Sequence, residues 1–275
     1  MMNDSKYKAN LFIVSPPKTG TSSLFAMLSE HFRICPCSIK EPHFFSNRYD
    51  RYEEGWYDSI YPTRQPDWEE DCRYYMESST TYFYSRWGFA RIKKDCSKDS
   101  KFICILRDPV ERFVSHYKHF RATNKIANDE VKLKKFLSEI TDSKWKEEFI
   151  QTLNKWKGWP RPFKNSRQSL KDRRLRNGMV AGHYKTNLER MYKYIDSKNV
   201  LVIPYSAYRK NYISTLDKIC DFLSIERFLP PHRANYNTSA SWEQFVNLDD
   251  EITDSMIADL TEYYDKVNEG LDFEY

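Results

Sequence analysis

The sequence contains no stretch that approaches about 18 consecutive apolar residues, so it predicts no membrane-spanning helix. Its first residues also lack the basic and then apolar pattern of a secretory signal peptide, because the apolar run at 11–14 is very short. We therefore expect a cytoplasmic protein. Internal repeats and low-complexity segments are absent too, which excludes a repeat architecture.

The six cysteines form no CxxC pair, and no histidine lies at zinc-ligand spacing from them. The sequence therefore predicts no metal centre. Cys35 and Cys37 are separated only by a proline, which leaves a redox or metal pair open as an alternative. The simpler interpretation is that they are free thiols in a reducing compartment.

The charge of the chain is small in total and unevenly placed. The net charge is +5, but residues 118–176 hold 17 Lys or Arg against 7 Asp or Glu. Such an excess either steers an anionic ligand or forms a solvated helical face. Helix-turn-helix, zinc-finger and RNA-binding signatures are absent, so we predict no nucleic-acid partner.

Short apolar runs alternate with helical patterns along the chain. Strands are predicted at 10–14, 72–76, 101–106 and 200–204, and helices at 21–32, 109–122, 177–195 and 212–223. A further helix end is predicted at 89–96 and two helices within 129–158, whereas 35–68 is expected to be loop with short helices and 161–176 loop. The alternation predicts an α/β fold with a central parallel sheet flanked by helices on both faces. The 275 residues fit one such domain, so we expect 1–275 to form a single domain.

A cluster of hydroxyl and cationic side chains lies between the first predicted strand and the first predicted helix. Its members are Lys18, Thr19, Gly20, Thr21 and Ser22. Anions bind at this place in parallel sheets, because the free amide groups of a helix's first turn point outward there. The order is not that of an ATP-binding Walker A loop, because the lysine precedes the only glycine. The alternative is an ordinary turn with a capping threonine.

A second polar motif follows the strongest predicted strand. Arg107 stands at its carboxyl end, and Ser115 lies roughly two turns along the next helix. A guanidinium fork with a nearby hydroxyl suits a terminal phosphate. Asp108 either caps this helix or pairs with Arg112. A purely structural ion pair between Arg107 and Asp108 is the alternative to a phosphate site.

The motifs PKTGTSSL and ILRDPVERFVSHY together resemble the sulfotransferases that use PAPS, which is 3'-phosphoadenosine 5'-phosphosulfate. Their wording resembles in particular the heparan sulfate and related carbohydrate sulfotransferases and their bacterial relatives. KEPHFF at 40–45, with the later GWY at 55–57, resembles the family segment that carries the catalytic glutamate, and 182–191 resembles a downstream family helix. The resemblance covers roughly residues 10–225 and implies a P-loop-like sulfotransferase fold.

The resemblance also implies a role for each matching position. The residues that would hold the 5'-phosphosulfate are Lys18, Thr19, Gly20, Thr21 and Ser22. Arg107 and Ser115 would hold the 3'-phosphate. Lys18 would stabilise the leaving phosphate, Glu41 would be the base, and His43 would lie near the acceptor as the rival base. PAPS would be the co-substrate and PAP the product, with no metal.

The sequence departs from the family at two places. Ser78 stands where relatives often have a lysine, and the late Arg-Lys-Gly element that closes over the nucleotide is missing. His232 with Arg233, or the segment 161–176, are candidates to replace that element. The acceptor stays open between a saccharide, a small molecule with hydroxyl or amine groups and a glycolipid headgroup, and we make no prediction of oligomeric state. The alternatives are a divergent P-loop nucleotide kinase and a catalytically silent protein that binds PAPS or another anion.

Overall fold

The computed structural model describes residues 6–62, 72–123, 137, 173–230 and 252–275. The chain divides into two compact units. The first is formed by Met1–Arg107, Arg190–Tyr236 and Glu274–Tyr275, and the second by Asp108–Glu189 and Asn237–Phe273. The first unit contains the sheet and every site residue predicted from the sequence except Ser115.

Five parallel strands in the order β2-β3-β1-β4-β5 form the sheet of the first unit. They are β1 (Leu11–Ile13), β2 (Ile34–Pro36), β3 (Tyr74–Ser78), β4 (Lys101–Leu106) and β5 (Val200–Pro204). The chain builds β2 and β3 on one side of β1 and then β4 and β5 on the other, so the strand order reverses at β1. Ligands of open α/β sheets bind at the carboxyl ends of strands where the order reverses. The predicted parallel α/β fold is confirmed.

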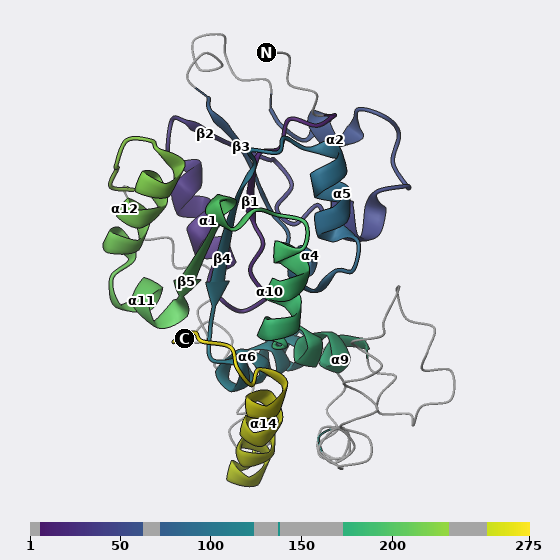
Figure 1. Ribbon diagram of the computed structural model, residues 1–275, viewed down its shortest axis with the longest axis vertical. Coiled ribbons are helices and arrows are strands. Elements are labelled where there is room, and N and C mark those ends of the chain that lie inside the picture. Colours follow the sequence, from purple (N-terminus) through teal and green to yellow (C-terminus); the bar gives the residue numbers. More distant parts are fainter. Residues whose placement is uncertain (1–5, 63–71, 124–136, 138–172, 231–251) are drawn as a thin grey trace. The chain divides into compact units, whose positions relative to one another are not determined.

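One face of the sheet packs against helices through a largely aliphatic cluster of side chains. Successive side chains of a strand point to opposite faces, so Leu11 and Ile13 of β1 share this side. The helices that cover it are α1 (Thr21–Ser29), α11 (Tyr205–Lys210) and α12 (Tyr212–Leu223) (Figure 1). Their buried side chains form one apolar cluster with the strands, which includes Leu24 and Ile219.

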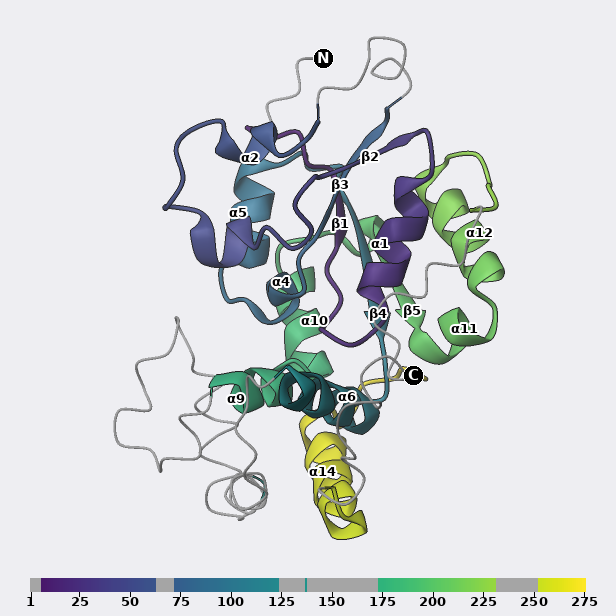
Figure 2. The same ribbon diagram turned by 180° about the vertical axis from the view of Figure 1, so that it is seen from behind.

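The opposite face carries the aromatic core. Phe12 of β1 and Phe102 of β4 stack there with ring centres 5.2 Å apart, and Phe45 and Phe89 contact this pair edge-on. The elements on this face are η1 (Phe44–Arg48), α2 (Trp56–Ser59), α4 (Thr81–Tyr84) and α5 (Gly88–Asp95) (Figure 2). The high aromatic content of the chain therefore goes largely into its core.

Helices make up the described part of the second unit. They are α6 (Pro109–Ala122), α9 (Arg173–Val180), most of α10 (Tyr184–Tyr192) and α14 (Asp254–Val267). Asp108 caps α6, because its side chain accepts a hydrogen bond of 2.8 Å from the amide of Glu111. Arg112 is fully buried and donates to the carbonyl oxygen of Gly178. Of the two alternatives for Asp108, capping of the helix or pairing with Arg112, the structure shows capping.

Four predicted elements have the observed bounds, namely β4, β5, α6 and α12. The predicted first helix ends earlier, at Ser29, because the chain turns there to begin β2 within a segment expected to be largely loop. The predicted strand at 72–76 begins two residues later as β3. None of the helices in the described part combines the length and the apolar character needed to cross a membrane.

The elements predicted for 129–195 differ from the structure or lie partly outside the described residues. The helix predicted at 177–195 is interrupted, since α9 ends at Val180 and α10 begins at Tyr184. The loop predicted at 161–176 is wrong for residues 173–176, which belong to α9. Residues 161–172 and the two helices predicted within 129–158 lie outside the described residues, apart from Leu137.

Candidate active site

The predicted phosphate loop, here residues 14–20 and called the phosphate loop below, follows β1 directly and is bound to the sheet. The hydroxyl of Ser15 accepts a hydrogen bond of 2.7 Å from the amide of Ile105, which extends the pairing of β1 with β4. Thr19 is buried and donates to the carbonyl oxygen of Pro16 at 2.8 Å. Gly20, with φ of 82°, precedes α1, and no side chain bonds to the first amides of that helix. Those amides point to the same edge of the sheet and suit an anion.

Lys18 and Arg107 meet at this loop. Arg107 Nη1 lies 3.5 Å from the carbonyl oxygen of Lys18, and its guanidinium lies 5.0 Å from the ring centre of Tyr205. Burial lowers the pKa of Lys18 to about 8, and the positive charge of Arg107 contributes. Two cations held close together in a partly buried place repel each other, and a bound anion would relieve this repulsion. The structure thus brings together two residues that lie far apart in the sequence.

Two tyrosines of α11 complete this side of the site and were missed by the sequence analysis. A Cβ added to Gly20 would lie 2.9 Å from the ring of Tyr208 and 3.4 Å from that of Tyr205. The sequence signal that could have indicated these tyrosines was their position just after a predicted strand. Tyr205 directly follows β5, and Pro204 at the end of β5 pairs with Leu106, the residue before Arg107.

Glu41 and His43 lie on a segment that is bound to the end of β3. The amide of Glu41 donates to the carbonyl oxygen of Ser78 at 3.0 Å, and the amide of His43 donates to Ser79 Oγ at 3.0 Å. Ser78 is paired with Ile13, the last residue of β1. The segment therefore lies at the carboxyl edge of the sheet, where the phosphate loop also begins.

The carboxylate of Glu41 has three polar neighbours. Oε1 accepts from Lys40 Nζ at 2.8 Å, and Oε2 accepts from Thr80 Oγ1 at 3.1 Å and lies 3.4 Å from His43 Nε2. His43 Nδ1 lies 2.9 Å from Thr81 Oγ1. Burial lowers the pKa of His43, and this effect outweighs that of Glu41, which raises it. The lowered pKa favours a neutral ring at neutral pH.

Lys40 was not predicted as a site residue. It places a cation beside Glu41, whereas Ser78, where relatives often have a lysine, is buried and uncharged. The signal in the sequence was its direct proximity to Glu41. Ser115 lies on α6 in the second unit, so its place in a common phosphate site with Arg107 stays a prediction.

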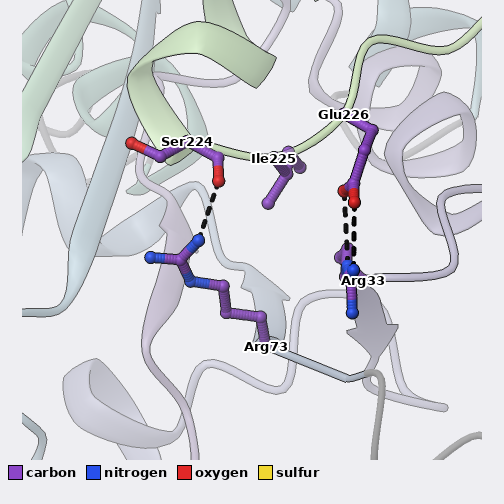
Figure 3. A pocket seen from close by; sticks show the side chains of 5 residues that line it. All are labelled: Arg33, Arg73, Ser224, Ile225 and Glu226. Carbon is purple, nitrogen blue, oxygen red and sulfur yellow. Dashed lines mark hydrogen bonds and ion pairs between the residues drawn. The ribbon is translucent and has the colours of Figure 1, made fainter.

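An open hollow of about 540 Å³ lies at the other edge of the sheet, before β2 and β3. It is lined by Arg33, Arg73, Ser224, Ile225 and Glu226 (Figure 3). Arg33 pairs with Glu226 at 2.9 Å. Arg73 donates to the carbonyl oxygen of Ser224 at 2.7 Å. Because both cations already have protein partners, we assign no ligand to this hollow.

The cysteines are free thiols in the structure. Cys35 and Cys37 are both buried, and burial raises the pKa of the Cys37 thiol. Both cysteines are thus compatible with the free-thiol interpretation, and the reducing compartment stays a prediction. Within the described ranges, no group of three or more His, Cys, Asp or Glu side chains is placed to hold a metal ion.

Comparison with known proteins identifies the family. The model of the sulfotransferase domain matches residues 8–235. Among curated relatives, the bifunctional heparan sulfate N-deacetylase/N-sulfotransferase 4 of Mus musculus is 26% identical over 239 residues, which cover 84% of this chain and 23% of the relative. The heparan sulfate glucosamine 3-O-sulfotransferase 3B1 of Homo sapiens is 26% identical over 237 residues, which cover 85% and 50%. The chain belongs to the sulfotransferase family, and it spans about a quarter to a half of these relatives.

Solved structures share the fold. A sulfotransferase from Alicyclobacillus acidocaldarius has a TM-score of 0.58 and 22% identity, with 94% of this chain and 95% of that chain covered. The mouse sulfotransferase SULT7A1 complexed with PAP has a TM-score of 0.50 and 15% identity, with 98% and 86% covered. These likenesses confirm the P-loop-like sulfotransferase fold, and with the curated relatives they confirm the family resemblance seen in the sequence.

Proposed function

We propose that this chain transfers a sulfuryl group from PAPS to a hydroxyl or amine of a saccharide or small-molecule acceptor and releases PAP. One observation carries the proposal, which is the meeting of Lys18 and Arg107 at the phosphate loop. A cation whose pKa is lowered by burial and by a like charge marks a place for an anionic group. We further propose that 1–275 act as one sulfotransferase domain, because the family match takes in residues of both units.

The proposed donor site has two parts. The 5'-phosphosulfate binds to the loop and the start of α1, through the groups of Lys18, Thr19, Gly20, Thr21 and Ser22. Arg107 binds the 3'-phosphate with Ser115, as the family resemblance implies. The ring of Tyr205 supports the plane of the Arg107 guanidinium.

In the proposed reaction, Glu41 takes the proton of the acceptor hydroxyl or amine. The acceptor atom forms its bond to sulfur while the bond between sulfur and the bridging oxygen of the donor breaks. Lys18 stabilises the negative charge that collects on the leaving phosphate. Thr80 and Lys40 hold the Glu41 carboxylate, and the neutral His43 ring beside it is the rival base. The proposal assigns no step to a metal ion.

The acceptor side favours a saccharide with anionic groups as the first class to test. The relatives cited above are named for heparan sulfate. Lys40 pairs with Glu41, and its ammonium group has further donors that suit an acceptor with carboxylate or sulfate groups.

Binding of PAP, measured by calorimetry without metal and with ATP as comparator, tests the donor site. We expect Arg107→Ala to weaken PAP binding by about 10–100-fold, the usual effect of losing charge-assisted hydrogen bonds. Lys18→Ala should weaken PAP binding as well. Arg227→Ala is the matched control, because Arg227 is exposed and pairs with Asp221. ATP with Mg²⁺ binding better than PAP would favour the nucleotide kinase instead.

Transfer of labelled sulfate from PAPS to desulfated heparin tests the chemistry. Glu41→Gln should retain PAP binding and lose transfer, because the amide cannot take up the acceptor proton. PAP binding with no transfer to any acceptor or to water would leave the silent binding protein as the better account.

A further inference from the structure

A carboxyl group is buried in the aromatic face of the sheet, and the proposed reaction does not use it. Glu77 in β3 is 1% exposed. Its Oε2 accepts from the hydroxyl of Tyr57 and from that of Tyr82, the latter at 3.1 Å, and the side chain of Ser79 is a further hydrogen-bonding neighbour of the carboxyl. Burial raises the pKa of Glu77 to about 7. A carboxyl in such surroundings is unfavourable for the fold. Groups of this kind cluster at functional sites.

Tyr82 connects this carboxyl to the segment that carries Glu41 and His43. Its hydroxyl gives its proton to Glu77, so the oxygen lone pairs remain to accept the amide of Phe45 at 3.1 Å. This amide is the third in a row of alternate amides bound to residues 78–82, after those of Glu41 and His43. The three bonds form a clamp between the two segments.

The clamped segment has a backbone that needs support. Glu41 has φ of 60° and His43 has φ of 54°, both in the left-handed region. This region is unfavourable for residues with a Cβ, and such residues persist in it only where the surroundings hold them. The clamp holds the backbone on which both residues lie.

We propose that Glu77 is a positioning residue, whose buried carboxyl orients the Tyr82 hydroxyl and thereby holds Glu41 and His43 in the conformation used for catalysis. This inference rests on the function proposed above, because it takes Glu41 to be the base. The titratable groups that face Glu77 are Tyr57, Tyr61, Cys37, Cys96, Tyr82 and Glu41. By contrast, the charges that act on His43 are those of Glu41, Arg48 and Lys40. Glu77 is not among these charges, so we expect a change at Glu77 to reach His43 through the position of the segment.

Three variants and one control test the proposal. Tyr82→Phe removes one hydroxyl, Glu77→Ala removes the carboxyl, and Glu77→Gln keeps an oxygen that can accept from both tyrosines. Tyr74→Phe is the control, because this buried tyrosine donates at 2.9 Å to the carbonyl oxygen of Leu223, outside the clamp. The readouts are the NMR titration of the His43 ring, PAP binding by calorimetry, and transfer of labelled sulfate to desulfated heparin.

We expect Tyr82→Phe and Glu77→Ala to loosen the segment and expose His43 to water. The pKa of His43 then rises toward its ordinary value of 6.5, because burial is what lowers it. Their kcat falls by about 10–100-fold, the usual effect of a misplaced catalytic group, while PAP binding is unchanged. Glu77→Gln retains the His43 titration and most of kcat, and Tyr74→Phe changes neither.

Two results would overturn the proposal. One is a His43 titration in folded Tyr82→Phe and Glu77→Ala that matches the wild type. The other is a Glu77→Gln variant that behaves like Glu77→Ala, which would make the charge, and not the hydrogen bond, the important property. If Glu77→Ala does not fold, Tyr82→Phe decides alone, since it removes a single atom. Failure of the proposed function shows separately, as absent PAP binding in the wild type.

Discussion

The lowered pKa of Lys18 predicts that PAP binding takes up a proton above neutral pH. Burial and Arg107 bring this pKa to about 8 in the free protein. At pH 7 the ammonium group is then mostly charged, and at pH 9 only about a tenth of it is. A bound phosphate favours the charged form and returns the pKa toward or beyond its ordinary 10.5. A protein molecule whose Lys18 side chain is uncharged must therefore gain a proton when it binds PAP.

The size of the effect follows from this difference in pKa. At pH values between about 8 and the pKa of Lys18 in the complex, the affinity for PAP falls up to tenfold per pH unit. This fall corresponds to about 1.4 kcal/mol of binding free energy per pH unit. The sign is fixed, because the group is more basic in the complex than in the free protein, so raising the pH through 8 weakens binding. The second ionisation of a phosphate monoester is near 6, so the ligand itself is fully charged throughout this window.

Calorimetry in two buffers of different ionisation enthalpy counts the protons directly. Uptake should be close to zero at pH 7 and approach one proton at pH 9. Lys18→Arg should remove the pH dependence, because a guanidinium stays charged at both values. Lys198→Arg is the control, since the Lys198 side chain is 73% exposed and pairs with Asp196. The reasoning is refuted if Lys18→Arg keeps the wild-type pH dependence, or if the wild type takes up no proton at pH 9.

Two further predictions concern stability. Gly20→Ala should lower the free energy of unfolding in urea by more than Gly55→Ala, and only Gly20→Ala should weaken PAP binding. Both glycines have left-handed φ, of 82° and 86°, which costs an alanine about 1–2 kcal/mol, but only at Gly20 would the Cβ meet a ring, at 2.9 Å; equal losses would mean that the rings of α11 yield. Glu77, with its pKa raised from 4.5 to about 7, contributes about 3 kcal/mol of stability at low pH that is lost as the pH rises through 7. Glu77→Gln should therefore flatten the decline in unfolding free energy between about pH 4.5 and pH 7, and an unchanged decline would assign it to other groups.

The parts of the structure that the sequence predicted well carry local signals. Residues 101–106 and 200–204 are continuous apolar runs, as expected of strands buried on both faces, and their observed bounds agree. Helix α6 has a capping aspartate and a proline at its start, which is why its first residue could be predicted. The phosphate loop and Arg107 could be proposed as site residues because polar and cationic residues at strand ends stand out against apolar neighbours.

The parts that were missed depend on long-range contacts. Strand β2 has three residues and ends in a proline, so its pattern is too short to be distinguished from loop. The predicted strand at 72–76 ended before Glu77, and only the folded structure shows that the Glu77 side chain is enclosed. Nothing local indicates that the Tyr82 hydroxyl binds an amide 37 residues earlier, or that Tyr205 lies beside Arg107.

Backbone strain supports the choice of site residues independently of the family resemblance. In the described part of the chain, four residues other than glycine have positive φ. One is Ser224, which ends α12 in the left-handed cap conformation common at helix ends. The other three are Lys18, Glu41 and His43. Each such conformation costs about 1–3 kcal/mol and gathers at sites where function, and not stability, decides the geometry. The three residues predicted to act in catalysis are thus residues whose backbone the fold holds against its own preference.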